Sequence, residues 1–147
     1  MIRRFWPQFL EGSPAVGLLF LRLFVGYAMM MHGWSKIQKP FGWMGEGAPV
    51  PSILQALAAL SEFGGGLALI VGFLTPLASL GIMSTMFVAC LSYIKKGAPL
   101  IGQGGAPSYE LPALFFVTTL CLLLAGPGKL SLDALLFNKK KGGFGRY

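Results

Sequence analysis

The chain has 147 residues, of which 54% are apolar and only 12% are charged. Soluble domains carry about 25% charged residues, so this composition excludes an ordinary soluble protein and favours a single membrane domain. The formal net charge of +7 does not indicate nucleic-acid binding, because the basic residues lie at the ends of apolar segments, where they flank membrane spans.

The first long apolar segment runs from Ala15 to Trp34 and contains one charge, Arg22. Ser13-Pro14 is typical of a helix start, so we expect a spanning helix over residues 14–34. At about 1.5 Å per residue it is long enough for a hydrocarbon core of roughly 30 Å. An ionised side chain is costly there, and Arg22 therefore indicates a partner inside a helical bundle.

Two further apolar segments follow after a loop rich in Gly, Pro and aromatic residues. We expect the second span over residues 52–74, with Glu62 near its middle, and the third over residues 77–94. Small residues recur at every fourth position in both segments, which predicts that these two helices pack closely.

The last apolar segment predicts a fourth span over residues 109–125. Ser131-Leu132-Asp133 is typical of a capped helix start and predicts a short amphipathic helix over residues 132–137 on the membrane surface. Residues 138–147 are basic and Gly-rich, and we expect them to be disordered. The predicted fold class is all-α, a four-helix transmembrane bundle that forms one domain over residues 1–147.

The basic residues also predict the orientation of the bundle. Seven lie in the two termini and the turn between the second and third spans, and four lie in the other loops. The first set is Arg3, Arg4, Lys129, Lys139, Lys140, Lys141 and Arg146, and the second is Lys36, Lys39, Lys95 and Lys96. The positive-inside rule then places both termini in the cytoplasm and the protein in the inner (plasma) membrane as a multi-pass protein.

Depth along the spans predicts which polar groups meet. Arg22 lies about 10 Å and Glu62 about 18 Å from the cytoplasmic ends of their helices. Two extended side chains can bridge such a difference, so we predict an Arg22–Glu62 pair inside the bundle. The pair either lines a site or only fixes the register of the helices.

A second set of polar residues is expected near the outer face, where His32, Lys36, Tyr93, Tyr109 and Glu110 lie within about two turns of the interface. Together they could move a proton or hold an anionic head group. Lys and Tyr are also ordinary interface anchors, which leaves His32 and Glu110 as the stronger candidates. The two cysteines show no metal-ligand spacing, and we predict no metal site.

Four short stretches carry a family resemblance. They are Arg22-Leu23, Gly26, His32-Gly33 and Lys36; Glu62, Gly65-Gly66, Leu69, Gly72 and Thr75-Pro76; Glu110-Leu111; and Gly126-Pro127-Gly128 with Ser131-Leu132-Asp133. In this order and spacing the chain resembles the DoxX family over about residues 15–137. The resemblance implies a small four-helix integral membrane protein. It also implies a link to redox chemistry, since family members are associated with a quinone-reducing thiosulfate dehydrogenase or with enzymes of thiol and superoxide stress.

Three hypotheses of function follow. The first is a membrane subunit of a quinone-linked redox system concerned with sulfur or thiols, with a soluble or membrane redox partner and no covalently bound cofactor. In it the quinone pocket is lined by Arg22, Glu62, Gly26 and Gly66, and the candidate catalytic residues are Arg22, Glu62, His32 and Glu110, the last two relaying protons. The second is a non-catalytic scaffold or anchor for a soluble partner. The third is a transporter of a small anion or lipid, which with four helices would require a homo-oligomer.

Overall fold

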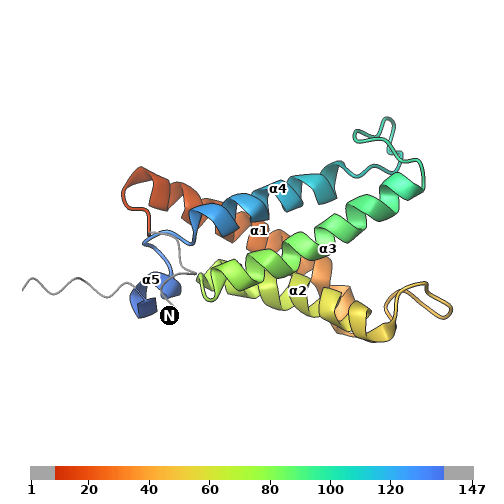
Figure 1. The fold of residues 1–147 in the computed structure, drawn as a ribbon, viewed down its shortest axis with the longest axis horizontal. Coiled ribbons are helices and arrows are strands. Elements are labelled where there is room, and N and C mark those ends of the chain that lie inside the picture. Colours follow the sequence, from red (N-terminus) through yellow and green to blue (C-terminus); the bar gives the residue numbers. More distant parts are fainter. Residues whose placement is uncertain (1–8, 138–147) are drawn as a thin grey trace, which may run out of the picture.

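The computed structural model describes residues 9–137, which form five helices and no strand (Figure 1). The helices are α1 (Ser13–Ile37), α2 (Ser52–Val71), α3 (Thr75–Lys95), α4 (Glu110–Ala125) and α5 (Leu132–Phe137). The predicted all-α bundle of four apolar helices followed by a short fifth helix is therefore confirmed. The tail over residues 138–147, predicted to be disordered, lies outside the described residues.

The apolar helices differ in length. α1, α2 and α3 have 25, 20 and 21 residues and are long and apolar enough to cross a membrane. α4 has 16 residues and reaches about 24 Å at 1.5 Å per residue. It ends at Gly126, whose positive φ of 78° turns the chain into the buried Pro127-Gly128 segment.

The bundle consists of two helix pairs. α1 packs against α2 and α3 against α4, while α2 and α3 join the pairs along a further interface and α1 meets α4 over only a short stretch. Figure 1 shows that the two pairs diverge away from α5. We call the side with α5 and the turn over residues 72–74 the α5 end. The side with the loops over residues 38–51 and 96–109 is the loop end.

Glycine allows α1 and α2 to approach backbone to backbone. A Cβ atom on Gly26 would lie 2.6 Å from the Gly66 carbonyl oxygen, and a Cβ on Gly66 would lie 2.7 Å from the Met30 nitrogen. Both distances are far below van der Waals contact, so neither position accepts a side chain. Gly26 and Gly66 therefore form a helix contact, and they leave no space there for the predicted quinone pocket.

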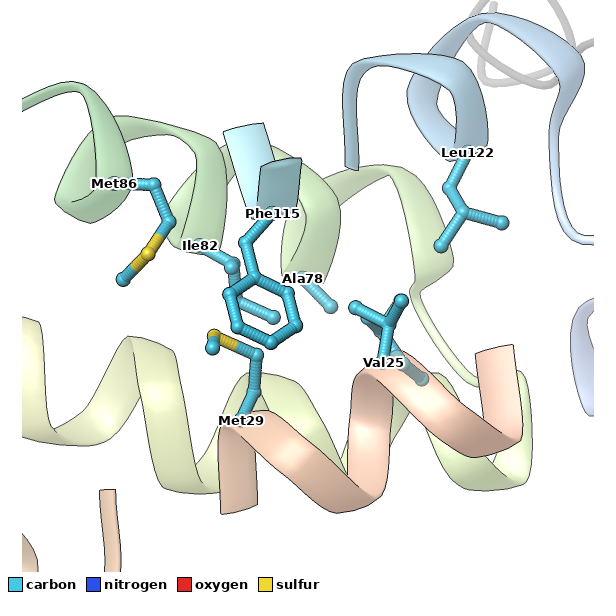
Figure 2. Close-up of a cluster of buried hydrophobic side chains, with 8 residues drawn as sticks. Val25, Met29, Ala78, Ile82, Met86, Phe115 and Leu122 are labelled. Atoms are coloured by element: carbon cyan, nitrogen blue, oxygen red, sulfur yellow. The ribbon is translucent and has the colours of Figure 1, made fainter. Parts of the chain in front are cut away.

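The apolar core lies where the four helices meet (Figure 2). Figure 2 shows Met29 of α1 beside Phe115 of α4, with Ile82 of α3 behind them. All members of the cluster are buried: Val25, Met29, Leu69, Ala78, Ile82, Met86, Phe115 and Leu122. This layer separates the polar groups of the α5 end from those of the loop end.

Three parts of the chain that the sequence places on one side do meet at the α5 end. The Lys129 N–H donates to the Leu10 carbonyl, and the Asp133 N–H donates to the Gly72 carbonyl, each at 2.9 Å. The N-terminal approach, the α2–α3 turn and the chain after α4 are thus held together. That this end faces the cytoplasm remains a prediction.

The close approach of α1 and α2 generates a test. Gly26→Ala should lower the free energy of unfolding by about 1–3 kcal/mol, because its methyl group forces the two backbones apart. Gly17→Ala is the matched control on the same helix, since nothing lies within 4 Å of a Cβ there. The control should be neutral or slightly stabilising. Thermal unfolding in detergent measures both, and equal effects of the two substitutions would contradict the packing described.

Candidate functional site

Arg22 and Glu62 do not pair, so the predicted contact between them is wrong. Arg22 Nη2 donates to the Leu130 carbonyl, whereas the Glu62 carboxylate accepts from Lys36 Nζ. Gly33 packs against Phe63, which puts Glu62 level with Gly33, eleven residues or about 16 Å along α1 from Arg22. The depth estimate failed because α1 extends well beyond the end of α2 at the α5 end, whereas the estimate started both helices in one plane.

Arg22 lies in a buried cluster at the α5 end, which we call the Arg22 cluster: Arg22, Gly72, Leu130 and Asp133. The Arg22 side chain is fully buried. Gly72 presses against its guanidinium, so that any Cβ at Gly72 would collide with Nη1 and with the Ser131 Cβ. Gly72 also has a φ of 71°, a left-handed conformation that is a second, independent reason for glycine at this position. Arg22 Nε and Nη1 have no acceptor among the described residues.

Asp133 supplies the negative charge of this cluster and fixes α5 to the bundle. Its two carboxylate oxygens accept from the Leu74 and Thr75 N–H groups at 2.8 Å each. These donors lie at the N-terminus of α3, where a carboxylate is stabilised by the free N–H groups and the helix dipole. Asp133 is fully buried and lies close enough for its charge to favour the Arg22 cation, although no ion pair joins the two side chains among the described residues. One carboxylate thus compensates a buried cation and caps a helix.

A second charged cluster lies at the loop end, which we call the Lys36 cluster: Lys36, Glu62 and Trp43. Lys36 Nζ lies 2.6 Å from both carboxylate oxygens of Glu62. The Glu62 side chain is 3% exposed and that of Lys36 is 24% exposed, so a buried carboxylate is held by a cation that still reaches the surface. The Trp43 ring centroid lies 4.6 Å from the Lys36 ammonium. This cation–π contact further stabilises the Lys36 charge.

Gln55 fixes the α1–α2 loop over this cluster. Its backbone carbonyl accepts from the Trp43 indole N–H at 2.9 Å, and its side-chain oxygen accepts from the Met44 N–H at 3.1 Å. Its side-chain nitrogen donates to the Val50 carbonyl at 2.9 Å. The first turn of α2 therefore holds the loop in place and keeps Trp43 over Lys36.

The predicted outer cluster is divided in the structure. His32 lies one turn before Lys36 on α1, and its ring meets Phe115 edge to face with centroids 5.9 Å apart. His32 is exposed. Glu110 begins α4, is exposed, and makes no hydrogen bond or ion pair with any residue in the range 9–137. Of these residues, Lys36 contacts Glu62, His32, one turn away from Lys36, contacts Phe115, and Glu110 stays apart.

Sequence reasoning missed the partner of each buried charge. Lys36 lies one turn from His32, but it was interpreted as an interface anchor. Asp133 was interpreted only as part of the capped start of α5; that cap is confirmed, since Ser131 accepts from the Ala134 N–H at 3.1 Å. The available signal for Asp133 was that it is the one acidic residue at the α5 end inside an apolar segment.

The cysteines and other metal-binding side chains form no further site in the described range. Cys90 on α3 is half-buried, Cys121 on α4 is exposed, and both are free. Between residues 9 and 137 no group of three or more His, Cys, Asp or Glu side chains is placed to hold a metal ion. The two charged clusters are therefore the sites that the polar residues of this range build.

Comparison with known proteins gives one family and two relatives. The DoxX family model matches residues 17–94. A Bacillus subtilis (strain 168) protein named "Putative oxidoreductase CatD" is 30% identical over 137 residues, 89% of this chain and 95% of the relative. The Escherichia coli (strain K12) protein named "Inner membrane protein YqjF" is 33% identical over 131 residues, 85% of this chain and 95% of the relative. No solved structure matches.

The Arg22 cluster generates a second test. Asp133→Ala should lower the free energy of unfolding by about 3 kcal/mol or more, because it removes the α3 cap and leaves a buried cation without its counter-charge. Glu11→Ala is the matched control, since Glu11 pairs with Lys129 at 3.0 Å while both side chains are more than half exposed. Such a surface pair is worth about 0.5 kcal/mol or less. The free energy of unfolding, measured in detergent, tests both variants. Equal losses in Asp133→Ala and Glu11→Ala would contradict the stabilising role of the Arg22 cluster.

Proposed function

Because the chain belongs to the DoxX family of membrane proteins, we propose that it is the membrane subunit of a redox system and binds a quinone or a similar lipophilic carrier at the loop end of α1. The observation that carries the proposal is the almost fully buried Glu62 carboxylate, held by Lys36 beside His32. The proposed site thus moves from the Arg22–Glu62 pair to the Lys36 cluster with His32, and Arg22 takes a structural role.

The chemistry of this site suits an amphiphilic head group. A carbonyl-bearing ring needs a hydrogen-bond donor and flat apolar neighbours. The Lys36 ammonium and the His32 ring are donors, and Trp43 supplies aromatic surface. His32 is the residue type best suited to exchange a proton near neutral pH. Glu62 is an acceptor that keeps Lys36 in place.

The position of the site suits a ligand dissolved in the bilayer. α1 and α4 diverge toward the loop end (Figure 1), and the two helices are in contact through His32 and Phe115. A carrier could enter from the side with its apolar tail among the exposed Leu and Phe side chains of the helices, while its head group reaches Lys36. Lys36 lies one residue from the end of α1, where proton exchange with water is possible.

The relatives support the same proposal. One is named an oxidoreductase and the other an inner membrane protein, and we infer a redox role in the inner membrane for this chain. A two-electron carrier bound in the membrane requires a donor, so a soluble or membrane redox protein is the proposed partner. The restriction to sulfur or thiol substrates rests on the family resemblance alone.

Titration of the purified protein with a quinone analogue in detergent tests this function. Wild type should bind saturably, and Glu62→Gln and His32→Ala should each weaken binding about tenfold or more, because the first removes the charge that holds Lys36 in place and the second removes a donor of the site. Glu110→Gln is the matched control, since Glu110 is an exposed carboxylate without a partner in the described range.

Two results would contradict the proposal. One is equal affinity of wild type and Glu62→Gln, with both proteins shown to be folded. The other is absence of binding to wild type, which would favour a scaffold that holds a soluble partner at the membrane.

A further inference from the structure

The outward surface of α1 differs in chemistry from those of the other helices. Its most exposed side chains alternate at spacings of four and three residues: Phe20, Phe24, Tyr27, Met31 and Trp34. We call this set the α1 outer face. The outward surfaces of α2, α3 and α4 consist mainly of exposed Leu, Ile and Val, which are ordinary lipid-facing residues. The α1 outer face is aromatic and contains a phenol.

The hydroxyl of Tyr27 is the unusual group on this face. Two hydroxyls on the outward surfaces of α3 and α4 are satisfied within their own helices, since Ser84 donates to the Leu80 carbonyl at 2.8 Å and Thr118 donates to the Leu114 carbonyl. Tyr27 is 58% exposed, and its hydroxyl, at the far end of a rigid ring, has no hydrogen bond to any described residue. It points away from the bundle and needs a partner from outside the chain.

The depth of Tyr27 along α1 makes a hydroxyl without a hydrogen-bond partner especially costly. It lies two residues, or about 3 Å, from the midpoint of α1, which spans Ser13–Ile37. Tyrosines of membrane helices favour the interfaces, where water and head groups satisfy the hydroxyl. In the hydrocarbon core an unsatisfied polar group costs several kcal/mol, so lipid is a poor neighbour for this side chain.

We propose that the α1 outer face is the interface with a second copy of this chain, related by a two-fold axis along the membrane normal. Such an axis brings each residue of the seam opposite its own copy at equal depth. A phenol is both donor and acceptor, so two Tyr27 hydroxyls satisfy one another. The alternating spacing is that of a left-handed helix pair. The dimer does not depend on the proposed function.

Cysteine cross-linking in membranes tests the seam. In a background with Cys90→Ala and Cys121→Ala, Phe24→Cys and Met31→Cys should each give a disulfide-linked species of twice the chain mass on mild oxidation, while Tyr27 stays intact. Leu57→Cys on α2 and Val117→Cys on α4 are controls at similar exposure and should stay monomeric. Cross-linking at the seam no greater than in the controls would overturn the proposal, as would a product whose mass shows a different protein.

Tyr27→Phe tests the hydroxyl itself. Interhelical hydrogen bonds in membranes are modest, so the dimer dissociation constant measured in detergent should rise roughly threefold. The ring is kept, so the melting temperature of the monomer should not change. An unchanged dissociation constant would overturn the proposal, because the phenol would then have no role in the contact.

Discussion

A buried arginine that must be compensated inside hydrocarbon determines much of this fold. Arg22 is fully buried, and its guanidinium can remain there only with acceptors and an opposite charge close by. The Leu130 carbonyl and Asp133 provide them. To do so, the chain after α4 must turn back under the bundle, α5 must pack against the α2–α3 turn, and Gly72 must leave room for the guanidinium. Asp133 then also caps α3, so one interaction ties three distant segments together.

At the loop end a buried charge is also compensated by a partner, but its surroundings are more open. Glu62 is almost as deeply buried as Arg22 and Asp133, but its partner Lys36 is partly exposed and lies under a loop aromatic, Trp43. The apolar layer around Met29 and Phe115 (Figure 2) separates the two clusters. The Arg22 cluster is enclosed by backbone and is suited to holding the fold. The Lys36 cluster lies beside His32, where the helix pairs diverge, and is suited to meeting a ligand.

Helix positions were predictable from the sequence, but helix contacts were not. The thickness of the hydrocarbon core fixes the length of an apolar segment, and α5 was predicted at its observed bounds. α2 ends at Val71 and not at residue 74, because Gly72 and Leu74 both adopt positive φ and turn the chain back. To predict whether Arg22 and Glu62 meet, one needs the stagger between α1 and α2. That stagger is set by the Gly26–Gly66 contact, and segment lengths contain no information about it.

The central claim is that the buried Glu62 carboxylate is paired with Lys36 and not with Arg22. A double-mutant cycle on the free energy of unfolding measures this directly, with Lys36→Met, Arg22→Met and Glu62→Gln alone and in pairs. The structure predicts a coupling of about 1 kcal/mol or more between Lys36 and Glu62, since contacting residues are not additive. It predicts additivity within about 0.5 kcal/mol between Arg22 and Glu62, which lie far apart. A coupling between Arg22 and Glu62 as large as that between Lys36 and Glu62 would contradict the account.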